Sequence, residues 1–147
     1  MQVKERNRTE NSSRRIQPGE DATELRSRLV EEFQDEDTRY TYAESFLNTR
    51  VAAQIKVLRE QRGLTQEALA RMIGTRQAGV SRLENVNYSA WKTNTLRRLA
   101  RALGVRLSIS FETFSGLLAE VENFERASLQ KPAFEQEVRR GMMRRRK

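Results

Sequence analysis

Residues 66–85 read QEALARMIGTRQAGVSRLEN, and this segment carries the strongest structural signal in the chain. Thr65 stands just before it, and a threonine hydroxyl can accept a hydrogen bond from an unpaired backbone N–H in the first turn of a helix. Gly74 follows the first apolar run, where the end of a helix favours a residue with a positive φ. Beyond that glycine, Val80 and Leu83 lie at helical spacing. The stretch therefore predicts two short helices joined by a tight turn, which is a helix-turn-helix unit.

The polar side chains of the second helix, at about residues 76–84, separate this unit from an ordinary helical hairpin. The apolar residues of that helix face inward, so its outer and N-terminal part carries Arg76, Gln77, Ser81 and Arg82. Glutamine pairs bidentately with adenine, and arginine with guanine, at the base edges in the DNA major groove. A solvated helix face can carry the same residue types, but in this register the pattern favours contacts to bases.

The net charge of +8 is distributed unevenly along the 147 residues. Residues 1–48 hold 8 basic and 11 acidic side chains, whereas residues 49–114 hold 12 basic and 4 acidic ones. The remaining residues, 115–147, hold 8 basic and 5 acidic side chains. A folded segment that is basic by this margin favours a polyanion, such as a nucleic acid, as partner. A solubilising surface is the alternative interpretation of the charge alone.

Several function classes are excluded by residue types that the chain lacks. It has no cysteine and no histidine, which removes disulfides, thiolate and imidazole catalysis and the usual zinc ligand sets. Aspartate occurs only at Asp21, Asp35 and Asp37, and no glycine-rich phosphate loop is present. We therefore expect a protein that is not an enzyme and that needs no metal or cofactor. No apolar run approaches about 18 residues or opens the chain, so we expect no membrane span, no secretory signal and a cytoplasmic location.

Composition and period divide the rest of the chain into segments. The polar residues 1–21 predict a disordered leader, and residues 131–147 predict a basic flexible tail. Between them, a helical N-terminal extension over 22–48 precedes a DNA-binding unit at 49–104. Within the extension, residues 39–42 are ambiguous between a short strand and the start of a helix. The expected helices of the DNA-binding unit span about residues 49–62, 65–73, 76–84 and 94–103.

After Gly104 the period of the apolar residues changes from that of a helix to that of a strand. Over residues 105–112 the apolar residues alternate with polar ones, namely at Val105, Leu107, Ile109 and Phe111. A lone strand cannot satisfy its backbone hydrogen-bonding groups. Apart from residues 39–42 the chain offers it no neighbour, so we expect pairing with the same strand of a second copy. Residues 105–130, a strand followed by a helix, are therefore the predicted dimerisation segment of a homodimer.

A set of residues between Val51 and Phe111 points to a known family. They are Leu58-Arg59, Gly63-Leu64-Thr65-Gln66, Leu69-Ala70, Ile73-Gly74, Gln77, Val80-Ser81, Leu83-Glu84, Leu99-Ala100 and Leu103-Gly104-Val105. With them the segment resembles the Cro/C1-type helix-turn-helix family, also called Xre-like regulators. The resemblance implies a compact bundle of about five helices, with the third helix in the DNA major groove. The expected fold is therefore mainly α, a Cro/C1-type bundle followed by one β-strand and a C-terminal helix.

The resemblance also implies roles for single residues. Gln66 would contact a phosphate and support Gln77, which would contact a base. Arg59 and Glu84 would form an internal salt bridge, which we interpret as structural. Gly79 lies within the recognition helix, where glycine is unfavourable, and the sequence offers no reason for it beyond a close approach of the backbone. The predicted base contacts are Arg76, Gln77, Ser81 and Arg82, and the predicted phosphate contacts are Gln66, Thr75, Asn85 and Lys92.

Two functions fit these predictions. The first is a sequence-specific, double-stranded DNA-binding transcriptional regulator, and among regulators we favour a repressor. The alternative is an antitoxin-like component of a toxin–antitoxin pair. Such a protein binds a toxin-like partner and represses its own gene through the same helix-turn-helix unit. Nothing in the sequence separates the two functions.

Overall fold

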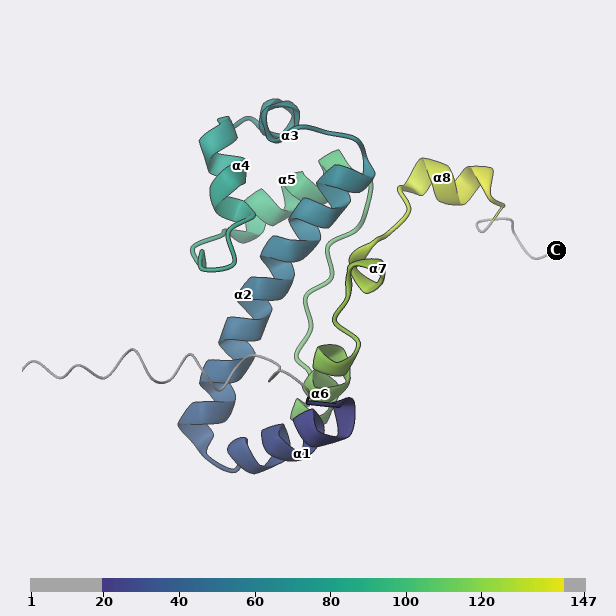
Figure 1. Ribbon diagram of the computed structural model, residues 1–147. Coiled ribbons are helices and arrows are strands. Elements are labelled where there is room, and N and C mark those ends of the chain that lie inside the picture. The colour runs from purple at the N-terminus through teal and green to yellow at the C-terminus, as the bar shows by residue number, and fades with distance from the viewer. Residues whose placement is uncertain (1–19, 142–147) are drawn as a thin grey trace, which may run out of the picture.

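The structure, a computed structural model, describes residues 20–141, and every regular element among them is a helix (Figure 1). The helices are α1 (Ala22–Glu32), α2 (Glu36–Gln61), α3 (Gln66–Ile73), α4 (Gln77–Leu83), α5 (Thr93–Leu103), α6 (Phe114–Glu122), α7 (Arg126–Leu129) and α8 (Phe134–Arg139). Residues 1–19 of the predicted leader and 142–147 of the predicted tail lie outside the described residues. None of the described helices is both long enough and apolar enough to cross a membrane.

Two apolar cores lie at opposite ends of α2, whose 26 residues span about 39 Å at about 1.5 Å per residue. Helices α3, α4 and α5 surround its C-terminal half, and α1 and α6 lie at its N-terminal end (Figure 1). The first core contains Ile55, Leu58, Leu69, Ala70, Ile73, Val80, Leu83, Leu96, Leu99 and Leu103. The second core contains Leu25, Leu29, Phe33, Tyr42, Leu118 and Val121. One long helix therefore joins a helix-turn-helix bundle to a smaller helical cluster.

The start of α2 resolves the segment that was ambiguous in the sequence. The Asp35 carboxylate accepts hydrogen bonds from the backbone N–H and the hydroxyl of Thr38, at 2.9 and 2.6 Å. These bonds cap the helix and hold the pKa of Asp35 below its usual value. Tyr42 is buried, and its ring packs edge-on against Phe33 with the centroids 5.3 Å apart. Residues 39–42 are therefore helical, and the helix expected over 49–62 is the C-terminal half of α2.

The predicted β-strand at 105–112 is wrong, because residues 20–141 contain no strand. Residues 105–113 run without regular structure, and the alternating side chains Leu107, Ile109 and Phe111 are 37, 69 and 106% exposed rather than half-buried. The physical reason is that alternation favours an extended chain, whereas a strand also needs a neighbouring backbone to hydrogen-bond. No other described segment supplies that ladder to residues 106–112. Within one chain, residues 105–112 therefore form no strand.

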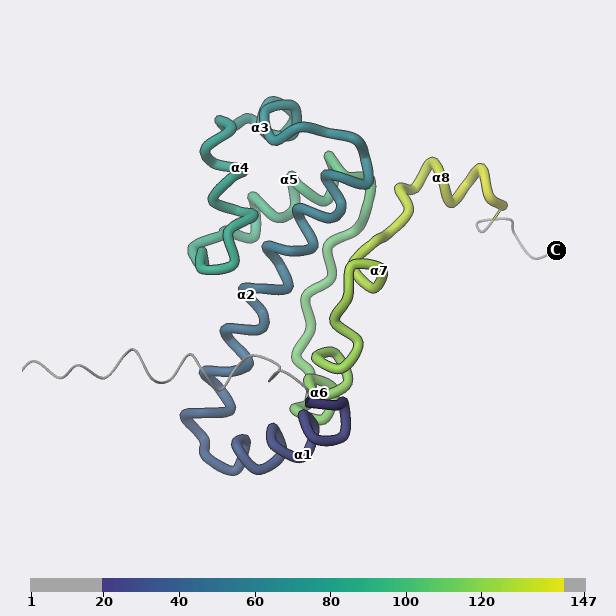
Figure 2. The backbone as a smooth tube through the Cα atoms, in the orientation of Figure 1, coloured from purple at the N-terminus to yellow at the C-terminus, as the bar shows by residue number. Residues whose placement is uncertain are grey.

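The chain returns from α6 to the helix-turn-helix end along α2, beside the segment 105–113 (Figure 2). Gln54 donates to the carbonyl of Leu129 at 3.1 Å, and Arg62 donates to the carbonyl of Lys131 at 2.8 Å. Further on, the backbone N–H of Phe134 donates to the carbonyl of Gly104 at 2.9 Å. A Cβ at Gly104 would stand 2.9 Å from the Ala133 Cβ, so the close approach requires glycine. Residues 129–134 are therefore held against the helix-turn-helix bundle by hydrogen bonds.

Candidate nucleic-acid interface

Helices α3 and α4 form the unit that residues 66–85 predict. Thr65 caps α3, because its hydroxyl accepts a hydrogen bond from the backbone N–H of Ala68 at 3.0 Å. Gly74 ends α3 in the left-handed conformation with φ of 74°. Leu69 and Val80 are fully buried where the two helices meet. The first helix, the turn and the second helix are therefore held at one angle by packing as well as by the caps.

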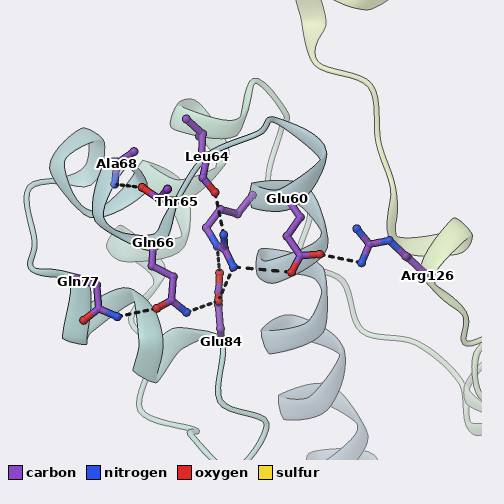
Figure 3. A network of polar contacts seen from close by, with 9 residues as sticks. Glu60, Leu64, Thr65, Gln66, Ala68, Gln77, Glu84 and Arg126 are labelled. Atoms are coloured by element: carbon purple, nitrogen blue, oxygen red, sulfur yellow. Dashed lines mark hydrogen bonds and ion pairs between the residues drawn. The ribbon is translucent and has the colours of Figure 1, made fainter.

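A chain of hydrogen bonds runs from the recognition helix α4 back to α2 (Figure 3). The Gln77 Nε2 donates to the Gln66 Oε1 at 2.7 Å, and the Gln66 Nε2 donates to the Glu84 Oε2 at 2.8 Å. Glu84 also accepts two hydrogen bonds from the Arg59 guanidinium, one of them at 3.2 Å. Gln77 is exposed, whereas the side chain of Glu84 is only 4% exposed. The chain thus runs from a solvent-facing amide to an ion pair inside the fold.

The ion pair between Arg59 and Glu84 forms as the resemblance implied. The side chain of Arg59 is 12% exposed, and its Nη1 also donates to the carbonyl of Leu64 at 2.8 Å. The hydrogen bond to Glu84 is the main cause that holds the pKa of Arg59 above its ordinary value. Arg59 therefore joins α2, the loop before α3 and the end of α4.

The predicted base contacts all lie on the exposed side of α4 or at its start. Arg76 is the N-cap residue of α4, and Gln77 is its first helical residue. Ser81 and Arg82 follow one turn later, and all four side chains are exposed. Among the described residues, only Gln77 of these four has a side-chain hydrogen bond or ion pair. Arg76, Ser81 and Arg82 therefore keep their hydrogen-bonding groups available to a ligand.

The predicted phosphate contacts stand at the ends of helices. Gln66 is the first residue of α3, Thr75 lies in the turn, and Lys92 is the N-cap residue of α5. Asn85 follows α4, and its Oδ1 accepts a hydrogen bond from the backbone N–H of Asn87 at 2.9 Å, so it shapes the loop. Hydrogen bonds bring Gln66, Gln77, Glu84 and Arg59 together, whereas Asn85 and Lys92 are not joined to this chain of bonds.

Two contacts in or next to this hydrogen-bond chain were missed from the sequence. One is the hydrogen bond from Gln66 to Glu84, and the other is the ion pair at 2.9 Å between Arg126 of α7 and Glu60, which neighbours Arg59 (Figure 3). Glutamine and glutamate 18 residues apart carry no periodic signal that would pair them. The crossing of α3 and α4 alone places them within reach.

The side chain of Thr75 packs closely against the backbone of Gly79 in α4. A Cβ built on Gly79 would stand 2.6 Å from the Thr75 Oγ1 and 3.4 Å from its Cγ2. The distance to Oγ1 is far shorter than an ordinary contact, so a larger residue at position 79 would require the Thr75 side chain to move. The unfavourable glycine is thereby explained by the close packing of the turn on the helix.

We therefore expect Gly79→Ala to lack the gain of about 1 kcal/mol that alanine normally brings over glycine inside a helix. In a Thr75→Ala background the same substitution should stabilise the protein by about 0.5–1 kcal/mol, because the obstructing atoms are gone. Urea denaturation of the four proteins in this double-mutant cycle measures the difference. Equal effects in both backgrounds would show that the contact has no energetic weight.

Residues 55–109 match the model of the helix-turn-helix family. No curated protein and no solved structure matches the chain. The matched residues cover the C-terminal end of α2, all of α3, α4 and α5, and the start of the extended segment. They include the whole hydrogen-bond chain from Arg59 to Gln77. Residues 55–109 therefore form a helix-turn-helix domain, similar to the DNA-binding domain of the Cro/C1-type regulators.

Proposed function

We propose that this protein is a sequence-specific transcriptional repressor that inserts α4 into the major groove of double-stranded DNA. The observation that carries the proposal is the outer face of α4. There, Arg76, Ser81 and Arg82 are exposed and unpaired among the described residues, and Gln77 is held by Gln66. Such side chains form hydrogen bonds with base edges, and the recognition helix of this unit lies in the major groove.

The surrounding residues supply the contacts that position the helix on DNA. The Gln66 side chain, Thr75 and Lys92 stand at or beside the starts of α3, α4 and α5. Helix starts carry unpaired backbone N–H groups and partial positive charge, which favour a phosphate. Asn85 orders the loop between α4 and Lys92. These contacts fix the register of the protein on the duplex, and α4 reads the sequence.

Gln77→Ala tests the proposal. The substitution should weaken binding to the cognate duplex by about 1–3 kcal/mol and leave binding to random DNA nearly unchanged, because only base contacts depend on sequence. Selection from a random duplex library at physiological salt gives the cognate site, and fluorescence anisotropy on both duplexes gives the affinities. Lys92→Gln is the control, since loss of a phosphate contact should weaken both complexes alike. An equal loss on both duplexes for Gln77→Ala would remove it from the base-reading residues.

We further propose that two copies bind together, through the apolar side chains that residues 105–113 leave in solvent. Ile109 and Phe111 are the most exposed large apolar residues among the described ones. Association of two copies would remove these side chains from water, which is favourable. Paired recognition helices about one DNA turn apart would read a site with two-fold symmetry.

The double substitution Ile109→Ser/Phe111→Ser should therefore turn a dimer into a monomer, because it removes the apolar surface that association buries. Sedimentation equilibrium at micromolar concentration measures the mass. Phe134→Ser/Val138→Ser is a matched control, since both residues are 51% exposed and lie on α8. We expect this control to keep the wild-type mass. A monomeric wild-type protein at that concentration would contradict the dimer.

The second candidate function, an antitoxin-like component, is supported by the surface at the other end of α2. Val30 of α1, and Tyr40 and Leu47 of the N-terminal half of α2, are 45, 51 and 49% exposed there, and none of them belongs to the helix-turn-helix core. A partner protein bound at that end would leave α4 available to DNA. If the selection from random DNA enriches no sequence until a partner is added, this second function replaces the first.

A further inference from the structure

We propose that Glu84 is a positioning residue that decides which base Gln77 reads. It touches no DNA in this proposal, but it sets the direction of the Gln66 amide, and the Gln66 amide sets that of Gln77. The inference rests on the proposed function, in which Gln77 contacts a base. It adds that the ion pair between Arg59 and Glu84 contributes to specificity as well as to the fold.

The first step concerns the partner of Gln66. Glu84 is paired with Arg59, and an ionised carboxylate accepts hydrogen bonds but cannot donate one. The Gln66 atom that faces it at 2.8 Å must therefore be the donor Nε2. Water has little access to this point, because the Glu84 side chain is 4% exposed. A reversed Gln66 amide would set two acceptors against each other where little water could relieve them.

The second step carries this direction to Gln77. With its Nε2 on Glu84, Gln66 presents its Oε1 to α4, so Gln77 must approach with its Nε2, at 2.7 Å. One N–H of Gln77 is thereby used. Its Oε1 and its second N–H stay available, and Gln77 is exposed to solvent. The Gln77 amide therefore offers a base one acceptor, its Oε1, and one donor, its second N–H.

The third step compares this pair of groups with the bases. Adenine presents a donor and an acceptor in the major groove, its N6–H and N7, whereas guanine presents two acceptors, O6 and N7. The fixed Gln77 amide matches adenine with two hydrogen bonds. Guanine would meet the Gln77 oxygen with an acceptor of its own. If the Gln66 amide were free to turn, its Nε2 could donate a hydrogen bond to the Gln77 Oε1. Gln77 could then donate both N–H groups of its own Nε2 to guanine.

Glu84→Gln tests the inference, because glutamine keeps the size of the side chain but can either accept from Gln66 or donate to it. The readout is the ratio of dissociation constants for two duplexes that carry adenine or guanine at the base pair where Gln77→Ala loses discrimination. We expect the wild type to prefer adenine by about tenfold or more, as a bidentate pair does. The variant should prefer it by about threefold or less, because a turned amide restores two bonds to guanine.

Further variants separate positioning from stability. Gln66→Met leaves the pair between Arg59 and Glu84 in place but breaks the relay, so it should lower the adenine preference as well. Glu67→Gln is the matched control, because Glu67, like Glu84, pairs with an arginine, here Arg71 of α3, but its side chain is 67% exposed. This control should keep the wild-type ratio, because the Glu67 side chain forms its hydrogen bond with Arg71 and none with the Gln66 amide. Thermal melting of each protein fixes a temperature at which all of them are folded.

The outcomes are distinct. If Glu84→Gln and Gln66→Met are folded and keep the wild-type ratio, Glu84 has only a structural role and the inference is overturned. If only Glu84→Gln lowers the ratio, the effect does not pass through Gln66, and the relay is likewise refuted. If Gln77→Ala itself loses no discrimination at any base pair, the proposed function of Gln77 fails, and the inference falls with it. A lower ratio in both variants with an unchanged Glu67→Gln supports the relay.

Discussion

Glu84→Leu alone should lower the free energy of unfolding by about 3–5 kcal/mol, the usual effect of removing one partner of a buried ion pair. The reason is that Arg59, whose side chain is 12% exposed, would keep its charge inside the fold with only the Leu64 carbonyl and the longer ion pair to Glu60, at 3.9 Å, as partners. Replacing both partners, as in Arg59→Met/Glu84→Leu, leaves no such charge. The double variant should therefore lie within about 1–2 kcal/mol of the wild type.

Urea denaturation followed by circular dichroism compares the single and the double variant. If the double variant is as unstable as Glu84→Leu, the ion pair contributes net stability that two apolar side chains do not replace. The double variant should also still bind DNA, because no predicted phosphate or base contact is removed. Its preference for adenine at the Gln77 position should fall, since Gln66 then has no carboxylate to face. Stability and specificity are thereby measured on one protein.

Leu69→Ala should destabilise the protein by about 2–5 kcal/mol, because Leu69 is fully buried at the centre of the helix-turn-helix core and truncation leaves a cavity. A loss of this size is a large fraction of the stability of a small domain. We therefore expect DNA binding to be lost together with the folded bundle when the protein is warmed to a moderate temperature. Thermal melting and a binding assay on the same samples check both.

Leu29→Ala is the matched control for that experiment. Leu29 is 1% exposed, but it belongs to the core formed by α1, α6 and the N-terminal half of α2. Its truncation should cost a similar free energy in that cluster, while the helix-turn-helix end keeps its own core and its affinity for DNA. Equal loss of DNA binding in both variants at a temperature where α3–α5 stay helical would show that the two cores do not act separately.

The helix-turn-helix end was predicted well from the sequence, because its signals are local. A hydroxyl at Thr65 and a glycine at Gly74 act on the backbone within one turn, so their meaning does not depend on the rest of the chain. The apolar spacing at Leu69 and Val80 describes one face of each helix, and both residues are buried. The match of residues 55–109 to the helix-turn-helix family confirms the resemblance that those residues carry.

The predicted strand failed for the opposite reason. Alternating apolar residues at 105–112 describe an extended backbone, but a strand is defined by hydrogen bonds to another segment, which alternation cannot supply. The same limit applies at residues 39–42, where two aromatic residues favoured a strand as much as a helix. There the carboxylate of Asp35 and the burial of Tyr42 against Phe33 decide for the helix.

By itself, the sequence determined the caps, the turn glycine, the apolar faces and the identity of the exposed side chains on α4, because each depends on residues within a few positions of one another. Only the tertiary structure decided that α2 is one helix between two cores, that Thr75 requires glycine at position 79, and that Gln66 stands between Glu84 and Gln77. The physical reason is that these contacts depend on how whole helices cross. A hydrogen bond between residues 18 positions apart forms only where packing brings donor and acceptor within about 3 Å.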